Sequence, residues 1–124
     1  MSAPLHGVVV CHGDLANALV AAVEEISGIQ GALTPITNSG ADRTALESRV
    51  AAAADGRATV IFVDLPSGSC LFAAMRRLAG REGIRIITGV NLAMLLEFIF
   101  HRDLDLDAVS ARVVEAGARS IGGR

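Results

Sequence analysis

A chain of 124 residues, of which 52% are hydrophobic and 19% charged, can bury a core but is too short for two full domains, so we expect one domain over residues 1–124. All 11 basic residues are arginine, which excludes Schiff-base chemistry, a P-loop lysine and the lysine of a receiver-type aspartate phosphorylation site. The formal charge of -2 and the absence of Trp, Tyr and any basic run argue against nucleic-acid binding.

The number of cysteines and the length of the apolar runs indicate the cellular compartment in which the protein works. Two cysteines make no disulfide framework, and we expect no secretory leader because residues 1–30 show no charged-then-apolar pattern. The longest apolar run, residues 92–100, is too short to span a bilayer. We therefore expect a cytoplasmic protein that meets a membrane only through other subunits.

The first strand is predicted over residues 5–11, with a run of three valines that suits a strand covered on both faces. His12 and Gly13 follow it, and we expect Asp14 to cap the next helix, which ends at Gly28. The apolar stripe of this helix is predicted to consist of Leu15, Leu19, Val23 and Ile26.

A weaker second strand over residues 31–36 contains Pro35, which predicts an edge position. Asp42 is predicted to cap a second helix, which ends at Asp55-Gly56. The clearest strand is residues 59–63. The elements expected after it are a turn over 65–69, a helix over 70–79, a strand over 84–88, an apolar helix over 92–100, a helix starting at 103–105, and a tail over 120–124.

This alternation of strands and helices predicts an α/β fold: a doubly wound, mainly parallel four-stranded sheet with helices on both faces. Ligands of such sheets bind beyond the carboxyl ends of the strands, where the strand order reverses. The alternation alone does not determine the order. A common solution, 2-1-3-4, puts the first and third strands at that point, and His12 and Asp64 would then face each other.

His12, Asp64 and the turn Ser67-Gly68-Ser69 form the strongest candidate site. A carboxylate that accepts the imidazole Nδ1–H leaves Nε2 as the free nucleophile. Backbone N–H groups of Gly13 and of the turn can bind an anion at a helix start. These residues suit a histidine that takes and passes a phosphoryl group. The alternative is a buried His–Asp pair that only stabilises the fold.

Other polar residues gave weaker candidates. Asn91 follows the fourth strand and lines the rim of the site or caps the loop. His6 lies at the opposite edge of the sheet, and His101 is expected to be a solvated helix-end residue. A metal site at Cys11, His12 and Cys70 is disfavoured because adjacent strand residues point to opposite faces. We expect no metal and no cofactor.

Three motifs in order give a more specific indication. They are the apolar strand that ends in His12-Gly13, the segment Phe62-Val63-Asp64-Leu65-Pro66-Ser67-Gly68-Ser69, and the segment Thr88-Gly89-Val90-Asn91-Leu92. Together they span nearly the whole chain, which resembles the mannose-type (mannose/fructose/sorbose) IIA component of the bacterial phosphoenolpyruvate:sugar phosphotransferase system.

The resemblance implies that His12 accepts a phosphoryl group from the phosphocarrier HPr and passes it to a IIB component. It makes Asp64 the orienting carboxylate, and Ser69, with the backbone around Gly68, a phosphate contact. It also implies a homodimer with an exchanged carboxyl-terminal strand. Two features depart from the family: Cys70 stands where a proline is frequent, and the tail after the last helix is short for an exchanged strand.

Two alternatives stay open at this point. We expect no IIB or membrane component within residues 1–124, so a regulatory partner could bind according to the phosphorylation state instead of sugar uptake using the phosphoryl group. The phosphotransferase subunit that serves dihydroxyacetone kinase shares the fold and the histidine. The segment Gly89-Val90-Asn91 favours the mannose type.

Overall fold

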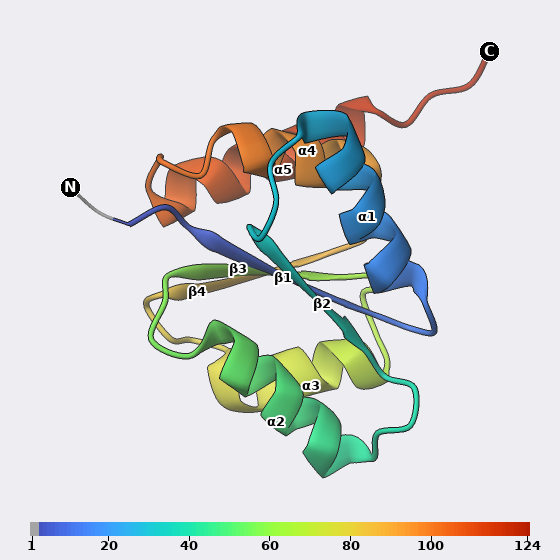
Figure 1. Cartoon of the computed structure of the whole chain (residues 1–124), viewed down its shortest axis with the longest axis vertical. Helices are drawn as coiled ribbons and strands as arrows, with labels where there is room; N and C mark the ends of the chain where they lie inside the picture. The colour runs from blue at the N-terminus through green and yellow to red at the C-terminus, as the bar shows by residue number, and fades with distance from the viewer. Residues whose placement is uncertain (1–2) are drawn as a thin grey trace.

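The computed structural model describes residues 3–124, in which four strands and five helices follow one another along the chain (Figure 1). The strands are β1 (His6–Cys11), β2 (Leu33–Thr37), β3 (Thr59–Val63) and β4 (Ile84–Thr88). The helices are α1 (Leu15–Ser27), α2 (Arg43–Ala54), α3 (Ser69–Leu78), α4 (Leu92–Phe100) and α5 (Leu106–Arg119).

The strands form one parallel sheet in the order β2-β1-β3-β4, which confirms the predicted fold class and order. Every residue of β1 and β3 is buried, because both strands lie inside the sheet and are covered on both faces. β2 is an edge strand, as Pro35 predicted. Proline is tolerated there because an edge strand needs fewer backbone donors.

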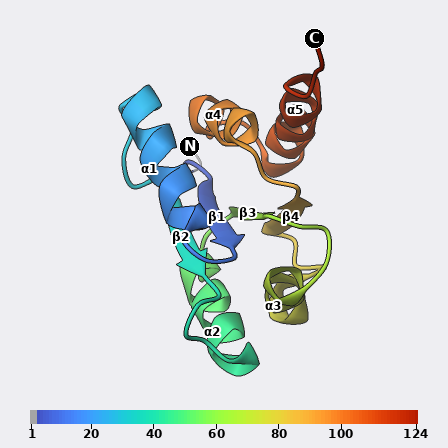
Figure 2. The same ribbon diagram turned by 90° about the vertical axis from the view of Figure 1, so that its right-hand side faces the viewer.

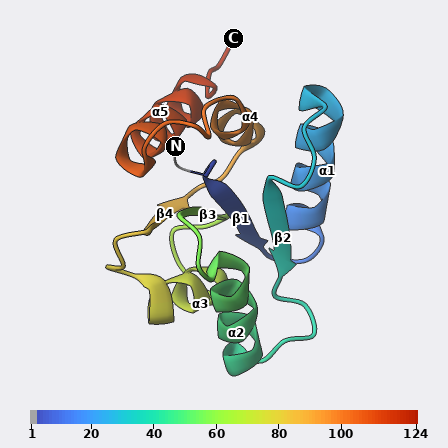
Figure 3. The same ribbon diagram turned by 60° about the vertical axis from the view of Figure 1, so that its left-hand side comes forward.

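Helices α1, α4 and α5 cover one face of the sheet, and α2 and α3 cover the other (Figures 2 and 3). Alternate residues of β1 divide between the two cores: Val9 and Cys11 pack with the first group of helices, and Val8 and Val10 with the second. The sheet therefore separates two aliphatic cores. Cys11 and Cys70 belong to different ones.

The buried stripe of α1 differs from the predicted one. Val23 is buried as expected, but Leu15 is 44% exposed and Ile26 is 60% exposed. The other buried positions are Ala16 and Val20. The helix is therefore rotated about its axis relative to the prediction, so that a different face contacts the sheet. Small and β-branched residues lie on the buried face because α1 packs closely on β1 and β2.

The carboxyl-terminal end, residues 121–124, forms no regular secondary structure and extends away from the body of the fold (Figure 1). No helix within residues 3–124 combines the length and the hydropathy needed to cross a membrane.

Candidate functional site

The site lies at the carboxyl ends of β1 and β3, where the chain connects β1 to β2 on one side and β3 to β4 on the other. His12 directly follows β1, and Asp64 directly follows β3. The register pairs Val10 with Val63, so the two strands end nearly level. The structure thus brings together the two side chains that we expected to face each other.

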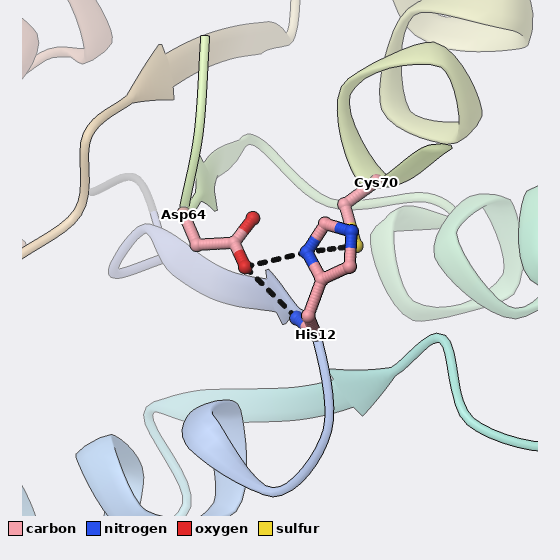
Figure 4. Close-up of side chains that lie close together, drawn as sticks. All are labelled: His12, Asp64 and Cys70. Atoms are coloured by element: carbon pink, nitrogen blue, oxygen red, sulfur yellow. Dashed lines mark hydrogen bonds and ion pairs between the residues drawn. The ribbon is translucent and has the colours of Figure 1, made fainter. Parts of the chain in front are cut away.

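Asp64 holds His12 by two hydrogen bonds to one oxygen (Figure 4). Oδ2 lies 2.8 Å from the ring Nδ1 and accepts the backbone N–H of His12 at 2.9 Å. The other oxygen, Oδ1, accepts the Leu65 N–H at 2.9 Å. An Nδ1–H facing a carboxylate leaves the lone pair of the imidazole on Nε2.

The carboxylate charge of Asp64 is favoured by these contacts. Burial acts to raise the pKa of Asp64, but the hydrogen bonds from the His12 backbone, the His12 ring and the Leu65 backbone hold the pKa below its ordinary value. Asp64 is therefore an ionised acceptor at neutral pH, which stabilises the Nδ1–H tautomer of His12.

The two side chains differ in their access to solvent. The Asp64 side chain is 10% exposed and the His12 side chain 43% exposed. Within residues 3–124, Nδ1 of His12 is engaged and Nε2 has no hydrogen-bond partner. The arrangement can therefore present an oriented imidazole at the protein surface, with Nδ1 held by Asp64 and Nε2 free of partners.

The loop after β2 supports the His12 turn through contacts that were not predicted from the sequence. Asn38 Oδ1 accepts the Gly13 N–H at 3.1 Å, and the Asn38 N–H donates to the carbonyl of Cys11 at 3.3 Å. Thr37 Oγ1 donates to the carbonyl of Gly13 at 2.6 Å. The backbone N–H of Gly13, predicted to bind phosphate, thus already has a partner. The order of the elements could have predicted these contacts, because the loop after β2 and the turn after β1 both follow parallel strands and therefore lie at the same edge of the sheet.

The prediction that the Asp14 side chain caps α1 is wrong, since this side chain makes no capping hydrogen bond. The chain enters α1 through a tight turn in which Gly13 has a φ of +58° and the Leu15 N–H bonds to the carbonyl of His12. Asp14 is inside that turn rather than in the extended conformation from which a side chain folds back onto the helix.

The helix after Asp64 also begins without a side-chain cap. Its N-cap is Gly68, with a φ of +94° that favours glycine, and Ser69 is the first helical residue. The side chains of Asp42, Asn91 and Asp105 cap α2, α4 and α5. Among the helices of the described chain, the two that begin next to His12 and Asp64 are therefore the ones with first-turn N–H groups left open to an anion.

Cys70, the second residue of α3, lies beside the histidine ring. Its Sγ is 3.7 Å from Nδ1 of His12, and the residue is fully buried (Figure 4). Burial, together with the nearby Asp64 charge, raises the pKa of the Cys70 thiol to about 11. Cys11 is oriented toward the opposite core, as strand alternation predicted, so it does not share a site with His12 and Cys70.

The other predicted polar residues lie apart from this cluster. Asn91 has the capping role: Oδ1 accepts the Met94 N–H, and Nδ2 donates to the carbonyl of Gly117 at 3.3 Å. His6 is buried at the opposite edge, 2.8 Å from Thr34 Oγ1.

His101 ends α4, as predicted, but its side chain is not free in solvent. It is half-buried, with Nδ1 2.8 Å from the Glu97 carboxylate and Nε2 2.9 Å from Arg112. The reason is tertiary: α5 packs on α4 and places Arg112 beside the end of α4.

The site is a surface feature and not a deep pocket. A groove of about 660 Å³ lies between α3 and β4, and a second of about 350 Å³ lies between the starts of α2 and α3. His12 and Asp64 line neither groove, although Gly68 and Ser69 line the second. The geometry suits a reaction in which another macromolecule brings the reacting group to His12.

Comparison with known proteins is consistent with this geometry. Residues 7–114 match the family model of the PTS system fructose IIA component, EIIA-man. No curated protein gives a significant match.

Solved structures share the fold over nearly the full chain. Phosphotransferase system component EIIA from Streptococcus agalactiae is 19% identical, with a TM-score of 0.88 and 96% of each chain covered. The mannose/sorbose-specific IIA subunit from Enterococcus faecalis is 20% identical, with a TM-score of 0.84 and coverage of 98% of this chain and 96% of that one. A sigma-54 interaction domain protein from Enterococcus faecalis is 15% identical, with a TM-score of 0.75 and coverage of 97% and 95%.

Proposed function

Because the chain belongs to the mannose-type IIA family of the phosphoenolpyruvate:sugar phosphotransferase system, we propose that it is a phosphoryl carrier whose acceptor is Nε2 of His12. The observation that carries this proposal is the hydrogen bond of 2.8 Å between Nδ1 of His12 and Asp64, with the imidazole half exposed. The chain acts as one IIA-type domain, in the cytoplasm, between two protein partners.

The first transfer takes the phosphoryl group from the phosphohistidine of HPr. The phosphorus–nitrogen bond in the donor breaks as the lone pair of His12 Nε2 forms a new phosphorus–nitrogen bond, and the donor imidazole leaves with its electron pair. The Nδ1–H proton stays between His12 and Asp64. As positive charge develops on the His12 ring, the ionised Asp64 stabilises it.

The phosphoryl oxygens need donors near Nε2. We assign this role to backbone N–H groups at the start of α3, around Gly68 and Ser69, and to the hydroxyl groups of Ser67 and Ser69. The support is the exposed turn and the absence of a side-chain cap on α3. The dipole of α3 adds partial positive charge at the same place.

The second transfer passes the group from His12 to a IIB component. Surface exposure of His12 supports this step, because two different proteins must reach the same nitrogen in turn. From the family resemblance we also propose that the chain forms a homodimer. The proposal does not specify whether the subunits exchange a strand.

The test is phosphorylation of the purified chain by phosphoenolpyruvate, enzyme I and HPr. We expect one phosphoryl group per chain, labile to acid and stable to base, formed only when HPr is present. Absence of labelling under conditions that label another IIA protein would contradict the proposal.

A second candidate function is regulatory. The same fold occurs in a sigma-54 interaction domain protein from Enterococcus faecalis. We infer as the alternative that a partner protein binds this chain according to the phosphorylation state of His12. Binding assays with phosphorylated and unmodified chain separate the two roles: a carrier loses its label to IIB, whereas a regulator keeps it and changes partner. Transfer to dihydroxyacetone kinase is the third outcome of the same assay.

A further inference from the structure

The thiol of Cys70 has no task in the proposed transfer, yet it lies in the same cluster as the reacting histidine. One ligand atom each of His12, Asp64 and Cys70 lies within 4.8 Å of the other two (Figure 4). The three side chains come from three different segments: the end of β1, the end of β3 and the start of α3. The cluster is therefore a product of the tertiary fold.

We propose that His12, Asp64 and Cys70 form a binding site for Zn²⁺, and that the bound ion withdraws His12 from phosphoryl transfer. The second half of this statement rests on the proposed function, whereas the first half does not. An imidazole nitrogen, a carboxylate oxygen and a thiolate sulfur are all common zinc ligands. The sulfur disfavours Mg²⁺ and Ca²⁺, which prefer oxygen alone.

The distances from Nδ1 to the other two ligand atoms are close to those that a tetrahedral ion needs. Zinc bonds of about 2.0 Å to nitrogen and 2.3 Å to sulfur place the two ligand atoms about 3.5 Å apart, and Nδ1 and Sγ are 3.7 Å apart. The 2.8 Å between Nδ1 and Oδ2 must widen to about 3.3 Å when the ion replaces the shared proton. The His12 side chain is 43% exposed, and we assign the fourth position of the tetrahedral ion to water.

Binding redistributes the protons in a defined way. The ion takes the lone pair of Nδ1, so the neutral imidazole carries its hydrogen on Nε2 instead. The ring keeps one N–H in total, and the Cys70 thiol gives its proton to the solvent. Asp64 changes from an acceptor of the Nδ1–H to a ligand of the ion.

The change of tautomer disables the acceptor. Nε2 has a lone pair in the ring plane when Asp64 holds the hydrogen on Nδ1, and it has none when it carries the hydrogen itself. A zinc-loaded chain would therefore fold normally and still fail to accept a phosphoryl group. The site thus offers a reversible, metal-dependent block on the carrier.

The experiment is a titration of the purified chain alone with Co²⁺, followed by displacement with Zn²⁺. We expect one Co²⁺ per chain, with a thiolate-to-cobalt charge-transfer band that Zn²⁺ abolishes. Long-range proton–nitrogen spectra of the zinc-loaded chain should show the His12 hydrogen on Nε2. Lack of the charge-transfer band in the unaltered chain would overturn the proposal.

Two variants form a matched pair, because each removes one thiol from a fully buried cysteine. Cys70→Ala should lose the band and weaken Zn²⁺ binding by more than about 100-fold, since loss of even a second-shell partner costs 10- to 100-fold. Cys11→Ala should keep both. His12→Gln, which removes the imidazole from a half-exposed side chain, should lose binding as well. Equal binding by the two cysteine variants would overturn the assignment of Cys70.

Failure of this inference and failure of the proposed function give different results. If His12 is phosphorylated and no metal binds, only the zinc site is lost. If Zn²⁺ binds with the expected tautomer and HPr does not label the metal-free chain, the acceptor role of His12 is lost and the zinc site remains. If Zn²⁺ binds and the rate of phosphorylation is unchanged, the metal-dependent block is overturned.

Discussion

A single oxygen of Asp64 accepts hydrogen bonds from both the backbone N–H and the ring Nδ1 of His12, at 2.9 and 2.8 Å. The first bond positions the chain after β1, and the second sets the rotation and the tautomer of the imidazole. One carboxylate therefore controls both where the histidine lies and which nitrogen is free. The geometry prepares Nε2 for reaction before any partner binds.

We expect His12→Ala to abolish phosphorylation by HPr, because no other side chain of the cluster offers a neutral nitrogen nucleophile. Mass spectrometry of the intact chain checks this result. The control is His101→Ala, which removes an imidazole bonded to Glu97 and Arg112, away from the site. It should be labelled like the unaltered chain, and continued labelling of His12→Ala would refute the acceptor assignment.

Asp64→Asn should fold and transfer the phosphoryl group about 10- to 100-fold more slowly, the usual loss when a partner that orients a functional histidine is removed. The amide still fits the space, but it carries no charge to stabilise the imidazolium. Rapid-quench measurement of transfer from phosphorylated HPr gives the rate. An unchanged rate would remove Asp64 from the mechanism.

Asn38→Ala should destabilise the chain by about 1 kcal/mol, the net worth of a typical hydrogen bond, because the Gly13 N–H loses its acceptor. The His12 turn should loosen, so transfer from HPr should slow as well. Ser39→Ala is the matched control, since this neighbouring serine is exposed. Urea unfolding and the transfer assay check both effects, and equal behaviour of the two variants would contradict a supporting role for Asn38.

The stability of the fold should fall as the pH drops from 6.5 to 4. Burial first, and the nearby charges of Arg57 and Arg102 in addition, lower the pKa of His6 from 6.5 to about 4. Between these values the unfolded chain binds a proton at His6 that the folded chain does not. The contribution of His6 to the free energy of unfolding is therefore complete above pH 6.5 and is lost as the pH falls toward 4.

The size of this effect is ~3 kcal/mol at most, from 1.36 kcal/mol for each unit of pKa difference. Urea unfolding across this pH range measures it. His6→Gln can keep a hydrogen bond to Thr34 but does not titrate, so its stability should depend less on pH. The same slope in both proteins would show that another group is responsible.

Much of the site was predictable because it depends on local order along the chain. A strand that ends in His12, another that ends in Asp64 and a glycine-containing turn before a helix are all visible in the sequence. Once the strands are parallel, these ends must meet at one edge of the sheet. Pro35 likewise predicted the edge strand because its ring cannot donate a hydrogen bond.

The features that the sequence did not determine are contacts between side chains that lie far apart along the chain. The sequence by itself determined which residues end the strands, because hydrophobic runs and turn residues act locally. Only the tertiary structure decided that Asn38 holds the His12 turn and that Cys70 lies against the imidazole, because those contacts depend on how three separate segments pack at one edge of the sheet.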